Sequence, residues 1–188
     1  MNNRFLGIAM IIGVLPIVAD SLTNGPTALG DTSTELTYML FGIGGMCGVA
    51  GLIKLNALGT NTVARALGFV PLIGFAAFVL GSALTLGGLI SPGDTLYTVL
   101  ASIGWIMMLV GMLIVGIMTI AAKNWQGWRR FAPLLAIVLA PVGLGIGALA
   151  SSQNLDLGGA LAFSGFLLLG IVIATFKPTP APEGIALV

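Results

Sequence analysis

The chain has 188 residues, of which 57% are hydrophobic and only 7% are charged, and its net charge is +1. Soluble domains carry about 25% charged residues, so this composition cannot cover a surface in water and lipid is the expected solvent for most of the exterior. The near-neutral balance also excludes the basic surface of a nucleic-acid-binding protein.

Six apolar stretches are long enough to cross the hydrocarbon core of a bilayer. Membrane strands would alternate apolar and polar residues, and the run over residues 105–117 does not. The sequence therefore predicts an all-α, polytopic integral membrane helical bundle of about six transmembrane helices. In chain order, we expect spans at residues 5–19, 36–53, 66–90, 96–122, 131–150 and 157–176. They form a single transmembrane domain, 1–176, followed by a proline-rich tail, 177–188.

The first span is the shortest, and its end at Ile17-Val18-Ala19 is similar to a signal-peptide cleavage site. We interpret it as a retained first helix, extending as far as Leu22.

The charges separate by side of the six-span arrangement. One side carries all the basic residues, Arg4, Lys54, Arg65, Lys123, Arg129, Arg130 and Lys177. The other side carries every acid except Glu183, namely Asp20, Asp31, Glu35, Asp94 and Asp156. The positive-inside rule then predicts a multi-pass protein of the cell membrane with both termini in the cytoplasm.

Helix starts are marked on the acidic side. Thr32 and Glu35 have the spacing of a capping box before the second span. Ser91, Pro92 and Asp94 form a similar start before the fourth.

One pattern of charge occurs three times along the chain. An arginine precedes a helix that runs to the acidic side, an acid lies in the link, and a lysine follows the helix that returns to the basic side. This pattern indicates three tandem helical hairpins. Topology rules alone also alternate charge in any six-span protein, so both interpretations stay open.

Glycines at helical spacing are the candidate helix-packing residues. Small residues let transmembrane helices approach closely, which would serve either packing within this bundle or docking of a partner subunit. The candidates are Gly44, Gly48, Gly51, Gly104, Gly111, Gly143 and Gly147.

Pro141 lies deep in the fifth span, where a proline removes a backbone hydrogen bond. We expect a static kink rather than a gate.

An aromatic and basic cluster follows the fourth span and includes Lys123, Trp125, Trp128, Arg129 and Arg130. Such clusters anchor a chain at the membrane–water interface, and they can also bind anionic lipid or a partner.

Sites of chemistry are not indicated. No Asp, Glu, Lys or Arg lies near the centre of a predicted span, which disfavours a pump or proton-coupled carrier. Histidine is absent, so His-ligated haem and His-ligated chlorophyll are excluded. Neither a metal-ligand spacing nor a catalytic set is present, so we expect no enzyme activity, no metal and no obligatory cofactor.

One stretch carries a resemblance. Residues 104–135 contain Gly-Trp, spaced glycines and then Gly127-Trp-Arg-Arg-Phe-Ala-Pro-Leu-Leu. This pattern resembles uncharacterised small multi-spanning bacterial membrane proteins, in which a Trp/Arg loop precedes a proline-containing span. The resemblance implies a helical bundle of the bacterial inner membrane and no particular activity.

Two functions are compatible with these features. The first is a non-catalytic accessory or structural subunit that packs in a larger membrane complex, against other membrane subunits or copies of itself. Such a subunit could hold lipid, quinone or carotenoid. The second is a small passive carrier or binding protein for a lipid-like or apolar molecule.

Overall fold

The chain folds into a bundle of antiparallel helices, seen in a computed structural model that describes residues 3–23, 31–150 and 156–176. The described helices are α1 (Asn3–Thr23), α2 (Thr32–Lys54), α3 (Thr62–Leu67), α4 (Val70–Leu86), α5 (Thr95–Ala122), the 3-10 turn η1 (Gly127–Phe131), α6 (Ala132–Ala150) and α7 (Leu157–Thr175). Within these ranges, six helical segments are long and apolar enough to cross a membrane. The predicted polytopic helical bundle is confirmed.

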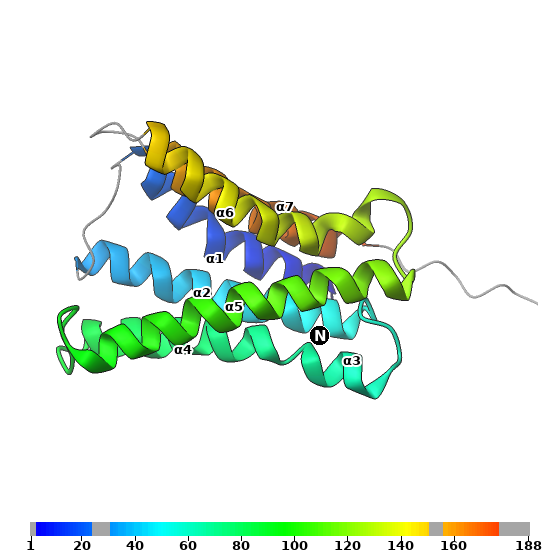
Figure 1. The fold of residues 1–188 in the computed structure, drawn as a ribbon, viewed down its shortest axis with the longest axis horizontal. Helices are drawn as coiled ribbons and strands as arrows, with labels where there is room; N and C mark the ends of the chain where they lie inside the picture. The colour runs from blue at the N-terminus through cyan, green and yellow to red at the C-terminus, as the bar shows by residue number, and fades with distance from the viewer. Residues whose placement is uncertain (1–2, 24–30, 151–155, 177–188) are drawn as a thin grey trace, which may run out of the picture.

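The helices form three hairpins, α1–α2, α4–α5 and α6–α7, arranged in a ring (Figure 1). Between hairpins, α2 packs on α4, α5 packs on α6, and α7 returns to α1. Hairpins are therefore present as predicted, while a common origin for them stays a prediction.

The third predicted span, 66–90, is not one uninterrupted helix. It begins with the short α3, passes through a turn at Gly68 and Phe69, and continues as α4. Pro71 lies in the first turn of α4, where its missing N–H costs little. The helix also ends earlier than predicted, at Leu86, because Gly87 and Gly88 follow and Gly88 has a positive φ of 68°.

Aromatic rings fill the middle of the bundle. Phe41 of α2 is completely buried and meets Phe75, Phe78, Phe163 and Phe166 edge to face, with ring centroids 5.1–6.1 Å apart. Edge-to-face pairs contribute about 0.5–1.5 kcal/mol each beyond the burial of their area. The cluster thus ties α2 to α4 and α7 across the centre of the ring.

The two ends of the bundle carry opposite charge, as the sequence predicts. At the end that holds α3, to the right in Figure 1, Arg65 donates to the side-chain oxygen of Asn56, and Asn124 donates to the carbonyl of Asn56. All six described Lys and Arg residues lie at this basic end, whereas the described acids lie at the other, acidic end. Lys177, Glu183 and the rest of the 177–188 tail lie outside the described residues.

The predicted capping box of α2 is wrong. Asp31, not Thr32, is the N-cap residue, and its side chain makes no capping hydrogen bond. Glu35 turns into the bundle instead of back to the helix start, as described below. Asp94 does precede α5 as predicted, and its carboxylate accepts from the N–H of Ser91 at 2.6 Å.

Candidate functional site

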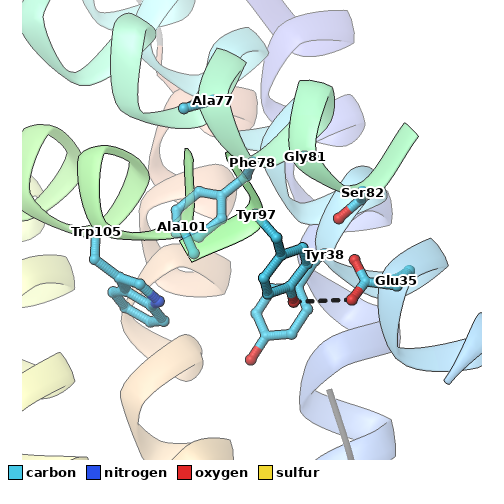
Figure 2. A pocket seen from close by; sticks show the side chains of 9 residues that line it. All are labelled: Glu35, Tyr38, Ala77, Phe78, Gly81, Ser82, Tyr97, Ala101 and Trp105. Atoms are coloured by element: carbon cyan, nitrogen blue, oxygen red, sulfur yellow. Dashed lines mark hydrogen bonds between the residues drawn. The ribbon is translucent and has the colours of Figure 1, made fainter. Parts of the chain in front are cut away.

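A cavity opens between α2, α4 and α5 at the acidic end of the bundle (Figure 2). Its volume is about 90 Å³. The lining residues are Glu35, Tyr38, Ala77, Phe78, Gly81, Ser82, Tyr97, Ala101 and Trp105. We call it the Glu35 cavity.

The polar end of the Glu35 cavity is a hydrogen-bonded pair. Glu35 lies in the first turn of α2 and is only 1% exposed, and its Oε1 accepts from the hydroxyl of Tyr97 at 2.9 Å. A buried carboxylate is costly unless it is hydrogen-bonded, so Tyr97 supports Glu35 across the 62 residues that separate them. Ser82 of α4 is buried beside this pair in the cavity wall.

Aromatic rings form the rest of the wall. Tyr38 stacks on Phe78 with centroids 6.1 Å apart, and Trp105 meets Phe78 edge to face at 5.4 Å. In Figure 2, Trp105 and Glu35 stand at opposite ends of the lining. Trp105 follows Tyr97 by two helical turns on α5, or about 12 Å at 1.5 Å per residue. The cavity therefore runs from a carboxylate at the acidic end to an indole deeper in the bundle.

A second cavity shares part of this wall. It measures about 110 Å³, lies between α2, α5, α6 and α7, and is also lined by Tyr38 and Trp105. Its carboxylate, Asp156, is the N-cap of α7 and accepts from the N–H of Gly159 at 2.8 Å. Tyr38 and Trp105 thus stand between two neighbouring cavities.

All seven glycines predicted to mediate packing face another helix of this chain. A Cβ at Gly44 would lie 2.9 Å from the Cα of Gly13, and one at Gly111 would lie 2.6 Å from Cδ of Pro71. The remaining five are Gly48 against Met10, Gly51 against Ile173, Gly104 against Phe78, Gly143 against Gly158 and Ala162, and Gly147 against Gly158. Their observed contacts are internal to the bundle.

Pro141 lies on the outside of α6, which continues as a helix from Ala132 to Ala150. With Leu109, Val110 and Val138, it lines an apolar groove of about 280 Å³ between α5 and α6. The proline therefore lines neither of the two inner cavities.

The predicted interface cluster divides between surface and core. Lys123 and Trp128 are exposed, and Arg129 and Arg130 are half-buried, with the guanidinium of Arg130 4.8 Å from the ring centroid of Phe131. Trp125 differs from the prediction because it does not face lipid. It is 1% exposed and stacks on Phe176 with centroids 4.9 Å apart.

The Glu35 cavity is not apparent from the sequence. The spacing of Glu35 from Thr32 is that of a capping residue, and no motif points to Tyr38 or Tyr97. A signal was nevertheless present, since Glu35 directly adjoins an apolar span and an ionisable residue at membrane depth is a functional candidate. No group of three or more Cys, Asp or Glu residues in the described ranges is arranged to hold a metal ion.

Comparisons with protein-family models, curated proteins and solved structures find no match to this chain. The fold itself defines the class, a polytopic α-helical membrane protein.

Proposed function

We propose that this chain is a non-catalytic membrane protein that binds a small, largely apolar molecule in the Glu35 cavity. The observation that carries the proposal is the buried Glu35–Tyr97 pair at one end of an aromatic-walled cavity. Ligand sites in proteins are typically such pockets, mostly apolar, with a few placed polar groups that fix orientation.

The size of the cavity limits the ligand. Sites for drug-sized molecules run to about 300–1,000 Å³, whereas this cavity measures about 90 Å³. It suits a compact head group of a few heavy atoms better than a carotenoid or a whole lipid. A longer apolar remainder would extend out of the cavity toward the acidic face or the bilayer.

The test replaces a small residue in the cavity wall by a large one, so that the new side chain occupies the cavity. Ala101 lines the cavity on α5, and two residues further on Ile103 points outward and is 40% exposed. Wild type, Ala101→Phe and Ile103→Phe are purified in mild detergent and examined by native mass spectrometry for retained small molecules. We expect wild type and Ile103→Phe to retain the same bound mass and Ala101→Phe to lose it. An identical result for all three proteins, with or without a bound mass, would contradict the proposal.

An accessory subunit is the second candidate, and the groove between α5 and α6 favours it. This groove is exposed and almost entirely apolar, a shape that a neighbouring transmembrane helix or an acyl chain fills. The same purification distinguishes the two functions, because an accessory subunit retains stoichiometric partner proteins. A protein free of partners argues for the binding function.

A further inference from the structure

The Glu35 cavity combines a carboxylate with aromatic rings, and this combination recognises a particular class of ligand. Cations are attracted to the faces of aromatic rings, most strongly to tryptophan, and the attraction grows to about 2 kcal/mol or more when the site excludes water. Tyr38, Phe78, Tyr97 and Trp105 supply four rings around one cavity. Glu35 supplies the opposite charge at its end.

The charge distribution of the whole bundle favours the same class. The five described acids lie at the acidic end, on which the cavity borders, and the six described basic residues lie at the far end. Clefts lined by one sign of charge with low-dielectric walls concentrate ions of the opposite sign. A cation approaching from the acidic side is therefore attracted before it reaches Glu35.

The neighbouring cavity is less suited to this role. Its carboxylate, Asp156, already holds the N-terminus of α7 through the N–H of Gly159, and an N-cap interaction contributes about 1 kcal/mol to helix stability. The N-cap residue of α2 is Asp31, and Glu35 instead accepts a hydrogen bond from Tyr97 in the cavity wall. The carboxylate placed for a ligand is Glu35.

We infer that the Glu35 cavity takes a small organic cation, a substituted ammonium group, with its charge beside Glu35 and its alkyl groups against Tyr38 and Tyr97. The inference rests on the proposed binding function and names its ligand class. A neutral molecule could accept or donate one hydrogen bond at the polar end, but it would gain no cation–π attraction from the rings that line the cavity.

The test compares two ligands of nearly equal shape. Choline carries a trimethylammonium group, and 3,3-dimethylbutan-1-ol replaces its nitrogen by carbon and is neutral. Binding of each to the purified full-length protein is measured by isothermal titration calorimetry. We expect choline to bind at least about tenfold more tightly than its neutral isostere, which corresponds to about 1.4 kcal/mol.

A matched pair of variants locates the effect. Glu35→Gln keeps the size of the side chain and an oxygen for the Tyr97 hydroxyl, and it should abolish the preference for choline. Asp31→Asn removes an exposed carboxylate four residues earlier, outside the cavity, and should keep that preference. Because wild type alone gives the ratio of the two ligands, the inference stays testable even if Glu35→Gln does not fold.

Each outcome has a distinct meaning. Equal binding of both ligands would overturn the cationic ligand and leave the proposed binding function standing. Binding of neither ligand to wild type would also overturn the cationic ligand, while the proposed binding function is decided separately by the mass that the protein retains in the native spectra. A preference for choline that survives Glu35→Gln would overturn the role of Glu35.

Discussion

Glu35 and Tyr97 show what one buried polar pair contributes in a bundle whose buried side chains are mostly apolar. A side-chain hydrogen bond between transmembrane helices contributes about 0.6 kcal/mol on average and reaches about 1.7 kcal/mol. Removing only one partner costs more, because the other group stays buried without it. Since the pair joins α2 to α5 directly, it also fixes the geometry of the polar end of the cavity.

Tyr97→Phe should therefore destabilise the protein by about 1 kcal/mol, because Glu35 loses the hydrogen bond from the Tyr97 hydroxyl while the ring and its packing remain. Thermal unfolding in detergent measures the change. Tyr38→Phe is the matched control, since Tyr38 lines the same cavity but its hydroxyl makes no hydrogen bond to the described residues. Equal losses in both variants would mean that the Tyr97 hydroxyl has no special role.

Single residues are also where the sequence predicted least. Glu35 and Trp125 both lie close to a helix end, and by sequence each suited a surface role. Both are almost completely buried, Glu35 by Tyr97 of α5 and Trp125 against Phe176 at the end of α7. Their partners lie about fifty or more positions away along the chain, so only the packing of the hairpins decides their environment.

At the scale of helices, the two helices of each hairpin come closest at a glycine on the first of them, α1, α4 or α6. A Cβ at Gly13 would lie 2.7 Å from the Cα of Gly44, one at Gly74 would lie 2.9 Å from the Cα of Met108, and one at Gly143 would lie 2.9 Å from the Cα of Ala162. Real Cβ atoms do not approach other atoms so closely, so these crossings need glycine. Close approach increases van der Waals contact, a main source of helix association in lipid.

Gly143→Ala should lower the stability of the α6–α7 hairpin by about 1–3 kcal/mol, the usual cost of overpacking a close contact. Gly145 on the same helix provides the control, because a Cβ there meets nothing within 4 Å. Gly145→Ala should be neutral or slightly stabilising, since alanine favours a helix over glycine by up to about 1 kcal/mol. Thermal unfolding of both variants checks the difference, and equal behaviour would contradict the close crossing.

Helices were more predictable than their contacts. Hydropathy alone gives six apolar segments, and α5 and α7 begin and end within one residue of the predicted bounds. The largest difference is at the third span, where the turn at Gly68 and Phe69 and the stop at Gly87 depend on local backbone conformation. Average hydropathy over a window does not register either feature.

For the molecule as a whole, the distribution of charge predicts the orientation in the membrane. The ring of hairpins places links of opposite charge at opposite ends, and apolar side chains such as Ile12, Ile106 and Ile171 are exposed between them. Cationic links stay preferentially in the cytoplasm during insertion. The acidic end, and with it the Glu35 cavity, should therefore face away from the cytoplasm.

This orientation can be tested with two single cysteines in a Cys47→Ser background, which removes the native thiol. Gly93→Cys places a thiol in the exposed link before α5 at the acidic end, and Val63→Cys places one on exposed α3 at the basic end. In intact cells, a membrane-impermeant maleimide should label Gly93→Cys alone, and Val63→Cys should react only after permeabilisation. The reverse pattern would place the Glu35 cavity on the cytoplasmic side. Labelling of both cysteines from outside would contradict the single membrane crossing, Thr62–Leu86, that separates Val63 from Gly93.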